Sequence, residues 1–487
     1  MKVSLIVEGC YPFVTGGVST WCDQLIRGLR QHSFEVVAIT GSSGQRPLLD
    51  LPENVLSLRT VALWDWVPPR WRSPRSIRRA FLDAYRPFLL AVLDPAVPQQ
   101  AFTDGLRELF VLAQATDLAL AQRSEEAVSL LAETWHEVFP DRRMSLRDAV
   151  EATEVVEHLL LPLSERVIEA DVSHAASNGL PALMGLAAKW RYGTPLVMSE
   201  HGVYLRERYL SCRGAGYRWP VKTMLLSLIR RICVSAYAAC DTIVPVNVYN
   251  QRWEVRNGAD PDAISTSYNG VDAASFAPAS GEPETPTIGW VGRIDPLKDL
   301  ETLVRAFALV RETIPEAVLR LFGPVPEGGE WYERRIRALV DELGLTASVT
   351  FEGPVRPVAR AYHASTVVAL SSISEGLPYT VMEAMMCGRT TVSTAVGGVP
   401  EIVGDTGVVV PPRDPGALAK GCIGLLDDPE RRACLAESAR ARAIERFCLE
   451  RMLEAFDGVY EEVTRRHRNL LASRFQAAGP VPAAVGR

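Results

Sequence analysis

Residues 367–384 read VVALSSISEGLPYTVMEA, an apolar run followed by a polar loop and a helix-forming segment. An apolar run of this length, closed by turn-forming residues, predicts a buried strand. Pro378 suits the first position of the helix that follows, because that position needs no hydrogen-bonding backbone N–H. The stretch therefore predicts one strand–loop–helix unit of a doubly wound parallel sheet, with a polar loop at the carboxyl end of the strand.

The same alternation extends through both halves of the chain. In the C-terminal half it recurs in the apolar runs TIGWVGRI (287–294), AVLRLFG (317–323), SVTFEGP (348–354), TTVSTA (390–395) and GVVVPP (407–412). The first forty residues predict a strand at 3–7, a glycine-containing loop, a helix at 18–29 and a strand at 34–40. We therefore expect an α/β fold of two Rossmann-like doubly wound domains facing a cleft.

Changes in composition set the expected domain boundaries. Residues 65–170 are mostly helical, and their length indicates a helical insertion rather than an ordinary connection. The segment APASGEPETPT, residues 277–287, is rich in Pro, Gly and Glu and is the expected linker. The expected parts are an N-terminal domain over 1–276, a C-terminal domain over 288–450, a helix over 451–470 that crosses back to the first domain, and a flexible tail over 471–487.

The composition argues against several classes of function. The 487 residues carry a net charge of −6 without a sustained basic stretch, which argues against nucleic acid as the main partner. The nine cysteines include no C-x-x-C pair, which argues against a zinc site or a disulfide framework. The opening apolar run is too short for a signal peptide, and no uninterrupted apolar stretch is long enough to span a membrane. We therefore expect a cytoplasmic protein.

The loop GRIDPLKD, residues 292–299, follows the strand TIGWV directly and is the first candidate site. Gly292 lets the backbone turn tightly at the strand end, and Arg293 and Lys298 can converge on one polyanion. A guanidinium fork beside a compact ammonium charge suits a diphosphate. An exposed loop with ordinary surface cations is the alternative, and the spacing by itself does not separate the two readings.

The loop SEGLP and its helix carry the second candidate site. The free N–H groups and the dipole of the first helical turn favour a phosphate, and the hydroxyl of Thr380 can join them. Glu375 precedes the helix, and Glu383 lies about one and a half turns into it. A nucleotide sugar, with its diphosphate in the middle, would meet one carboxylate at each hydroxyl-bearing end. The alternative, which the spacing alone favours, is one helix-capping acid and one surface acid.

The N-terminal half holds two weaker signals. TGGVSTW, residues 15–21, places Gly16 and Gly17 at a helix start, but an ordinary strand-to-helix turn has the same pattern. SEHGVYLRER, residues 199–208, puts His201 at the end of a strand. A lone histidine in such a place is more often structural than catalytic.

Taken together and in this order, these motifs resemble the retaining nucleotide-sugar glycosyltransferases of family 4, which have the GT-B fold. The resemblance covers most of the chain and favours function over the structural alternatives for the loop cations and the paired acids. The opening EGCYPFVTGGVSTW, the helical insertion and SEHGVYLRER are also similar to the PelF subgroup, the glycosyltransferases of Pel exopolysaccharide synthesis. The residues that carry the family resemblance are Gly16-Gly17, His201, Asn269-Gly270-Val271-Asp272, Gly292-Arg293 with Lys298, and the pair Glu375 and Glu383.

The resemblance implies a role for each candidate. Arg293 and Lys298 would hold the donor diphosphate and stabilise charge on the departing nucleoside diphosphate. Glu383 would bind the ribose hydroxyls, and Glu375 the hydroxyls of the transferred sugar near the reacting centre. The other implied donor contacts are His201, Gly16, Gly17, Gly292, Gly376, Leu377, Pro378 and Thr380.

The resemblance also implies a donor, an acceptor and a partner. The donor would be UDP-glucose or a related UDP-hexose, the acceptor a glycan, and the partner a membrane polysaccharide-synthesis complex that the protein joins peripherally. No D-x-D motif follows a strand, and Asp427-Asp428 lies in an expected turn between helices, so we expect transfer without a metal ion or cofactor. One departure from the family pattern bears on the base: residues 321–335 are less glycine-rich than the same stretch of many relatives.

Two other functions remain open. A non-catalytic nucleotide-sugar-binding subunit of an assembly complex would bind the donor without turnover, and a GT-B-fold sugar-nucleotide epimerase would need no glycan acceptor. A nicotinamide dehydrogenase is disfavoured, because the chain lacks a G-x-G-x-x-G fingerprint with a suitable acidic residue downstream. The paired acids and cations favour a transferase, since a binding module needs no charge aimed at a leaving group.

Overall fold

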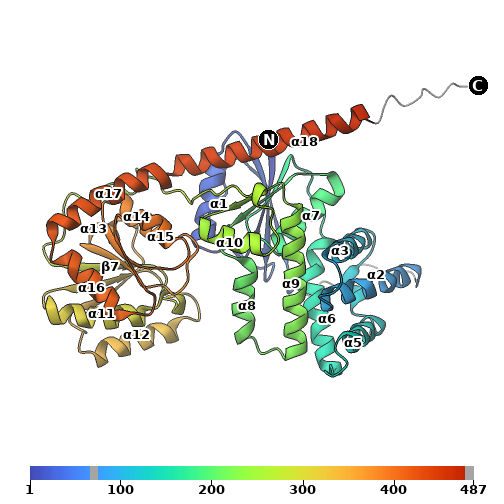
Figure 1. The fold of residues 1–487 in the computed structure, drawn as a ribbon, viewed down its shortest axis with the longest axis horizontal. Helices are drawn as coiled ribbons and strands as arrows, with labels where there is room; N and C mark the ends of the chain where they lie inside the picture. Colours follow the sequence, from blue (N-terminus) through green and yellow to red (C-terminus); the bar gives the residue numbers. More distant parts are fainter. Residues whose placement is uncertain (66–74, 478–487) are drawn as a thin grey trace, which may run out of the picture. The chain divides into compact units, whose positions relative to one another are not determined.

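The computed structural model describes residues 1–65 and 75–477, which belong to two compact units (Figure 1). Unit 1 comprises Met1–Pro245, Gln251–Ser265 and Phe456–Arg487, and unit 2 comprises Val246–Asn250 and Thr266–Ala455. Each unit contains its own six-stranded sheet, and neighbouring strands in both sheets run parallel. The expected pair of doubly wound sheets is therefore confirmed.

The sheet of unit 1 has the strand order β3-β2-β1-β4-β5-β6. Most of its strand residues are buried, as expected for a parallel sheet with crossover helices on its faces. From β1 the chain builds outward through β2 and β3 and then returns to the other side of β1 with β4, so the strand order reverses at β1. The strands are β1 (Lys2–Glu8), β2 (Ser33–Thr40), β3 (Val55–Ala62), β4 (Val172–Ala175), β5 (Leu196–Glu200) and β6 (Thr242–Pro245).

The described residues between β3 and β4 are mostly helical, in the region where the sequence predicts an insertion. Figure 1 shows several of these helices beside α9 (Trp219–Ala239), which they contact. Their core includes a stacked series of aromatic rings, from Phe81 through Tyr85 to Phe88 and Phe102. Residues 66–74, at the start of the expected insertion, lie outside the described part. The helices are α2 (Arg75–Leu93), α3 (Gln99–Ala113), α4 (Leu118–Gln122), α5 (Glu125–Val138) and α6 (Leu146–Leu160).

The other helices of unit 1 connect its strands. They are α1 (Gly17–Gly28), η1 (Leu161–Ser164), α7 (Leu180–Tyr192), α8 (Tyr204–Gly214), α9 and η2 (Pro261–Ala263). The helix α10 (Val248–Arg256) contributes its first residues to unit 2 and the rest to unit 1.

The sheet of unit 2 has the strand order β12-β11-β10-β7-β8-β9, and each strand falls within an expected apolar run. β7 and β10 are direct neighbours, with Val367 opposite Ile288. Strands β8 and β9 extend the sheet beyond β7, and strands β11 and β12 extend it beyond β10. The strand order therefore reverses between β7 and β10. The strands are β7 (Thr287–Val291), β8 (Val318–Phe322), β9 (Val349–Gly353), β10 (Val367–Leu370), β11 (Thr390–Thr394) and β12 (Val408–Val410).

Helices follow most strands of unit 2 and bury their apolar residues against the sheet. Trp290 of β7, for example, is fully buried in one cluster with Phe307 of α11 (Leu300–Thr313). The other helices are η3 (Pro296–Lys298), α12 (Glu330–Glu342), α13 (Ala359–His363), α14 (Tyr379–Met386), α15 (Val399–Val403), α16 (Pro415–Leu426) and α17 (Pro429–Phe447).

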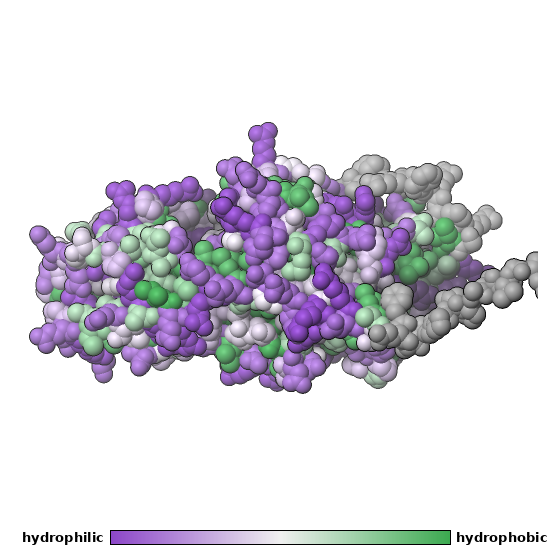
Figure 2. All heavy atoms as spheres, turned by 90° about the horizontal axis from the view of Figure 1, so that it is seen from above, coloured by the Kyte–Doolittle hydropathy of each residue, from purple (hydrophilic) through white to green (hydrophobic). Residues whose placement is uncertain are grey.

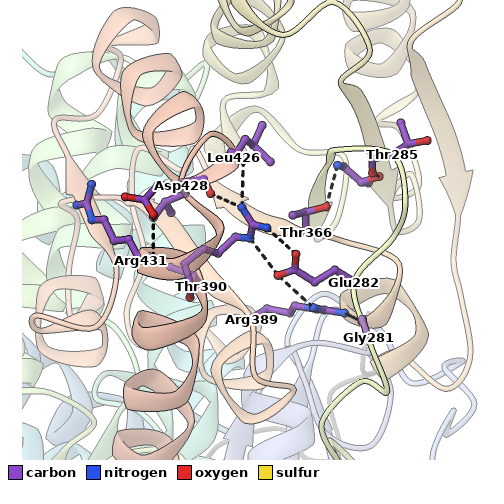
Figure 3. Close-up of polar contacts among 12 residues, drawn as sticks. Gly281, Glu282, Thr285, Thr366, Arg389, Thr390, Leu426, Asp428 and Arg431 are labelled. Atoms are coloured by element: carbon purple, nitrogen blue, oxygen red, sulfur yellow. Dashed lines mark hydrogen bonds and ion pairs between the residues drawn. The ribbon is translucent and has the colours of Figure 1, made fainter.

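The segment 277–287, expected to be a linker between domains, lies inside unit 2 and is fastened there (Figure 3). Two buried arginines hold it: Arg389 donates from its guanidinium to the carbonyl of Gly281, and Arg432 forms two hydrogen bonds with the carboxylate of Glu282. The preceding segment also packs on unit 2, because Val271 pairs with Cys448 in the manner of a strand. The unit boundary therefore falls after Ser265, and composition alone misplaced it.

The C-terminal helix α18 (Leu449–Ala477) belongs to unit 2 up to Ala455 and to unit 1 from Phe456 onward. A helix over 451–470 was expected, and the structure extends it to Ala477, so the first residues of the expected tail are helical. Tyr460 explains part of this attachment, since its hydroxyl contacts Nδ1 of His174 in the sheet of unit 1 at 2.6 Å. Residues 478–487 lie outside the described part.

The face of the molecule in Figure 2 is mostly hydrophilic, and its hydrophobic residues form small separate patches. Within residues 1–65 and 75–477, no helix combines the length and apolarity that a membrane span requires. The apolar residues of each unit lie mainly in clusters around its own sheet.

Replacing Arg432 by alanine should destabilise unit 2 by about 2 kcal/mol, because the carboxylate of Glu282 loses two hydrogen bonds and keeps only Arg389, whose Nη1 lies 4.0 Å away. The carbonyls of Leu425 and Leu426 also lose the guanidinium that donates to them. Chemical denaturation of the full chain measures the change. Arg431→Ala, at the exposed neighbouring position, is the control and should change the free energy of unfolding by less than about 0.5 kcal/mol. Equal effects of the two variants would contradict the fastening role of Arg432.

Candidate functional site

The candidate residues of unit 2 gather at the carboxyl ends of β7 and β10, where the strand order reverses. In open α/β sheets a crevice forms at such a point, because the connections from the two strands leave on opposite sides. Here the two loops are joined directly: the backbone N–H of Ile373 donates to the carbonyl of Leu297 at 2.9 Å. The hydroxyl of Ser371 also donates to the carbonyl of Lys298 at 2.7 Å. The site is therefore assembled by strand pairing, not by neighbours in sequence.

The loop after β7 is shaped by a close glycine contact. The N–H of Gly292 donates to the carbonyl of Phe322 at 2.9 Å, which brings Gly323 against Gly292. Gly323 has φ of +141°, and an added Cβ would lie 1.7 Å from the carbonyl oxygen of Gly292. Only glycine fits there. This constraint sets the direction in which the loop leaves the sheet.

The two cations of this loop have different surroundings. Arg293 is half-exposed, with a guanidinium nitrogen 3.7 Å from the carboxylate of Asp295. Asp295 also caps the short helix η3 by accepting from the N–H of Leu297 at 2.8 Å. Lys298, at the end of η3, points instead to the loop after β10. The structure thus places Arg293 toward solvent and Lys298 inside the site.

Lys298 forms an ion pair with Glu375. Its Nζ lies 2.5 Å from Oε1 of Glu375, and the hydroxyl of Ser372 donates to the same oxygen at 2.6 Å. Their side chains are only 21% and 11% exposed, so the pair is largely shielded from water. The sequence assigned the lysine to a diphosphate and the acid to a sugar, and did not predict their contact. A ligand that binds Lys298 must therefore replace Glu375 or leave the ion pair intact, and the same holds for a ligand that binds Glu375.

The helix α14 begins at Tyr379, one residue later than expected. Pro378 is its N-cap, with extended ψ of 122°, and not the first helical residue. No side chain of the described residues caps the first turn. Gly376, Leu377 and Thr380 flank this helix start as predicted by their sequence positions. A helix start without a side-chain cap can offer backbone N–H groups to an anion.

Glu383 lies on α14 below this start and has a tyrosine partner that the sequence did not reveal. The hydroxyl of Tyr362 donates to Oε2 of Glu383 at 2.5 Å. Burial raises the pKa of Glu383 to about 7, although the hydrogen bond from Tyr362 lowers it in part. The carboxyl of Glu383 is therefore partly protonated at neutral pH, unlike an ordinary surface acid.

A glycine pair after β11 fixes the loop that carries Glu375. The N–H of Gly398 donates to the carbonyl of Gly376 at 2.8 Å, and Nδ2 of Asn247 donates to the same oxygen at 2.9 Å. Gly397 has φ of +54°, and an added Cβ would lie 1.9 Å from the carbonyl oxygen of Glu375. The glycine pair therefore lets two loops pack closely, a role that a Gly-Gly sequence can suggest. The hydrogen bond from Asn247 could not be predicted from the sequence.

The segment Asn269-Gly270-Val271-Asp272, part of the family resemblance, supports the site from behind. Nδ2 of Asn269 donates to the carbonyl of Leu377 at 3.2 Å. A Cβ at Gly270 would come within 2.6 Å of the Cα of Leu449, so the backbones are in close contact. The side chain of Asn269 therefore holds the loop just before α14, and Gly270 packs the segment against the start of α18.

In unit 1, Gly16 and Gly17 lie exposed at the start of α1, as predicted. Gly16 is extended, with φ of 167°, and an added Cβ would meet no atom within 4 Å. Folding therefore does not require glycine at Gly16, and the position leaves room for a bound molecule.

His201 follows β5 and packs against Trp21, with ring centroids 4.5 Å apart. Its Nε2 is buried and has no hydrogen-bond partner in the described part of the chain. By contrast, the nearby His174 uses both ring nitrogens, on Ser199 and Tyr460. Burial lowers the pKa of His201 to about 4, so its imidazole is neutral at pH 7. His201 thus has a ring nitrogen without a partner in the described residues, whereas His174 uses both of its ring nitrogens.

The residue before His201 belongs to a buried acid pair. Burial raises the pKa of both Glu200 and Glu254, and the charge of Glu200 further raises the pKa of Glu254. Tyr237 donates its hydroxyl to Glu200 at 2.7 Å. The raised pKa values favour the protonated form of these acids, and Glu200 holds the strand end before His201 by accepting from the N–H of Tyr204 at 3.2 Å.

Replacing Gly397 by alanine should loosen the loop 374–378, because the added methyl group overlaps the carbonyl of Glu375 and breaks the bond from Gly398 to Gly376. Hydrogen exchange read by mass spectrometry should become faster in that segment. Gly416→Ala is the matched control, since its methyl group would meet only Asp414 at an ordinary 3.5 Å. Unchanged exchange in Gly397→Ala would show that the loop does not depend on the glycine pair.

Comparison with known proteins agrees with this geometry. Residues 1–262 match the family described as Domain of unknown function (DUF3492), and residues 285–428 match Glycosyl transferases group 1. The D-inositol 3-phosphate glycosyltransferase of Salinispora tropica is 31% identical over 317 residues, which are 60% of this chain and 64% of that enzyme. The enzyme of the same name from Acidothermus cellulolyticus is 30% identical over 326 residues, 62% of this chain and 70% of the relative.

Two solved structures share the fold. Anabaena HepE in complex with UDP has a TM-score of 0.62 at 16% identity, covering 95% of this chain and 100% of that one. Sucrose-phosphate synthase from Thermosynechococcus elongatus also has a TM-score of 0.62, at 20% identity, covering 96% and 99%. The two parallel sheets thus have the GT-B architecture. The N-terminal half matches DUF3492, and residues 285–428 match Glycosyl transferases group 1. Because a curated glycosyltransferase is also 30% identical over 70% of its length, the chain belongs to the Glycosyl transferases group 1 family.

Proposed function

We propose that the protein is a glycosyltransferase that moves a hexose from a nucleoside-diphosphate sugar to a glycan acceptor. The observation that carries the proposal is the cluster of Lys298, Glu375 and Glu383 around the start of α14, at the reversal of strand order in unit 2. A shielded cation, uncapped helix N–H groups and two carboxyls suit the three parts of such a donor, its diphosphate, sugar and ribose.

The diphosphate is proposed to bind Lys298, Arg293 and the first turn of α14. In the reaction an acceptor hydroxyl oxygen bonds to the anomeric carbon as the bond from that carbon to the diphosphate oxygen breaks. Negative charge develops on the departing oxygen, which can take up the proton that the acceptor hydroxyl gives up. Fixed cations and helix N–H groups stabilise this charge without reorganising. Arg293, being half-exposed, can turn toward the diphosphate from Asp295, to which it is only loosely paired.

The ion pair between Lys298 and Glu375 gives the donor a defined way to enter. When a phosphate takes over the charge of Lys298, Glu375 keeps the hydrogen bond from Ser372 and gains free acceptor sites. Those sites can receive hydroxyls of the transferred hexose. We propose this as the reason that the acid and the cation touch in the ligand-free protein.

The residues of unit 1 are proposed to contribute neutral contacts. His201 offers an uncharged imidazole with an unused Nε2, suited to a sugar hydroxyl, and Gly16 and Gly17 offer backbone N–H groups without side chains. Retention of configuration, most simply by front-face attack, is what the family 4 resemblance implies. Transfer without metal or cofactor remains a prediction that a chelator tests.

The nucleoside and the transferred sugar of the donor are proposed to be uridine and glucose or a related hexose. HepE was solved with UDP, and the curated relatives are named for inositol 3-phosphate, so the family relationship supports a nucleotide-sugar donor and leaves the acceptor open. The similarity to the PelF subgroup supports a role in exopolysaccharide synthesis. A cytoplasmic site of action, peripheral to a membrane synthesis complex, fits that role.

Calorimetric titration of the full chain with UDP and UDP-glucose tests the proposal. Saturable binding that Glu383→Ala weakens supports a donor site, and turnover of bound UDP-glucose separates a transferase from a non-catalytic subunit. The absence of binding by any nucleoside diphosphate would overturn the proposed function.

Lys298→Ala and Arg293→Ala should each lower turnover of the donor by about 100-fold or more, because each removes a cation that stabilises the leaving diphosphate. Release of UDP from UDP-glucose measures turnover. Lys420→Ala, which removes an exposed lysine on α16, should leave the rate unchanged. A variant that folds like wild type and keeps nearly full turnover would remove that cation from the leaving-group site.

The affinity for UDP should depend on pH through Glu383. Its pKa of about 7 means that the carboxyl is protonated below neutral pH, and ribose hydroxyls donate to the carboxylate form. Relative to Glu383→Gln, wild-type affinity should fall about tenfold for each pH unit below 7 and level off above it. The ratio of the two proteins cancels the titration of UDP itself. A constant ratio from pH 5.5 to 8.5 would contradict a ribose contact by Glu383.

A further inference from the structure

A cavity of about 400 Å³ lies in unit 1, and none of its lining residues is a proposed donor contact. It opens at the carboxyl ends of β1, β2 and β3, beside the strand at which the order of the sheet reverses. The helices α6, α8 and α9 form the opposite wall. Its size is within the range of small-molecule sites, and its position in the sheet is where such sites occur.

An ion pair between an arginine and a glutamate lies at one end of this cavity. Arg208 of α8 forms an ion pair with Glu8 at the end of β1, and the hydroxyl of Tyr204 donates to Glu8 at 3.0 Å. The guanidinium of Arg208 lies over the ring of Tyr204, 4.7 Å from its centroid. Burial raises the pKa of Glu8, and the charge of Arg208 partly offsets this rise. The group presents hydrogen-bond donors and acceptors with no net charge.

An aromatic surface lies on the other side. Trp64, just after β3, is 60% exposed, and its ring centroid lies 4.0 Å from that of His158. Nδ1 of His158 is buried without a hydrogen-bond partner in the described residues. An exposed indole supported from behind by a second ring, beside an unused polar atom, suits a ligand with an apolar face and a hydroxyl edge. Sugar rings have this character.

A second cavity, of about 370 Å³, adjoins the first and extends the space along the helical insertion. The two share Leu63 and His158 as lining residues. Arg123 of the second cavity is held by Glu157, at 2.8 Å from its Nε. The other charged residues lining the second cavity are all acids, Asp65, Asp117 and Glu165. We call the two adjoining cavities the insertion groove.

We propose that the insertion groove is the acceptor site of the enzyme and takes an uncharged oligosaccharide of two or more sugar units, rather than a phosphorylated acceptor. This inference rests on the proposed function, and it adds the class of acceptor. Both arginines that line the groove are already paired with carboxylates, and its further charges are acidic, so a phosphate would find no free cation and several like charges. The two adjoining cavities offer room for successive units, with Leu63 and His158 at their junction and the Trp64 ring beside His158 in the first cavity.

The full chain should be applied to a glycan array that contains neutral, carboxylated and phosphorylated members, together with a phosphorylated cyclitol. Wild type should bind neutral glycans of two or more units. Trp64→Ala should weaken that binding by about tenfold, the loss typical of a central aromatic contact. Tyr192→Ala, which removes an exposed aromatic ring elsewhere in unit 1, is the control and should bind like wild type.

Glu8→Gln gives a sharper test, because it keeps the shape of the side chain and frees the charge of Arg208. Binding should then shift toward phosphorylated glycans, and a far-UV circular dichroism spectrum like that of wild type would show that the variant keeps its fold although Arg208 has lost its carboxylate partner. Preference of wild-type protein for phosphorylated members, or binding of no glycan at all, would overturn the inference.

UDP binding measured on the same samples separates this inference from the proposed function. If UDP binds and no neutral glycan does, the acceptor assignment is wrong and the donor site stands. If neutral glycans bind in the groove and no nucleotide binds, the groove is a saccharide site and the transferase proposal is wrong.

Discussion

The parallel pairing of β7 with β10 is the constraint on which the candidate site of unit 2 depends. These strands are separated by many residues, yet their pairing brings the loops that follow them into direct hydrogen bonding. Lys298 comes from one loop and Glu375 from the other, and their contact exists only because the strands are neighbours. The strand order reverses at this pair, so the helices that follow diverge and leave the strand ends accessible.

Both units pair a cation near a candidate site with a carboxylate. Lys298 is held by Glu375 in unit 2, and Arg208 is held by Glu8 in unit 1. A buried or half-buried charge without a partner is costly, and pairing each of these cations with a carboxylate avoids that cost. The two pairs differ in how a ligand can use them. In our proposals a diphosphate would replace Glu375 at Lys298, whereas the ion pair of Glu8 and Arg208 would stay intact and bind hydroxyls.

The places where expectation and structure differ have physical causes. The segment 277–287 has the composition of a linker, but two buried arginines far along the chain fasten it to unit 2. The last helix continues beyond 470 to Ala477, with Tyr460 and other residues of its middle anchored in unit 1. Pro378 caps α14 instead of starting it, because its ψ is extended. Each outcome depends on contacts between distant residues, which local composition does not contain.

Periodicity and turn chemistry were enough to determine two doubly wound sheets, a helical insertion and the loops that hold the candidate residues. Local pattern works for these features because strands, turns and helix starts are properties of neighbouring residues. Tertiary structure alone decided which partners the candidates have: Tyr362 on Glu383, Asn247 on the loop of Glu375, and Glu8 with Arg208. It also decided the protonation of Glu383 and His201, since a pKa is set by burial and by neighbours that come from other strands and helices.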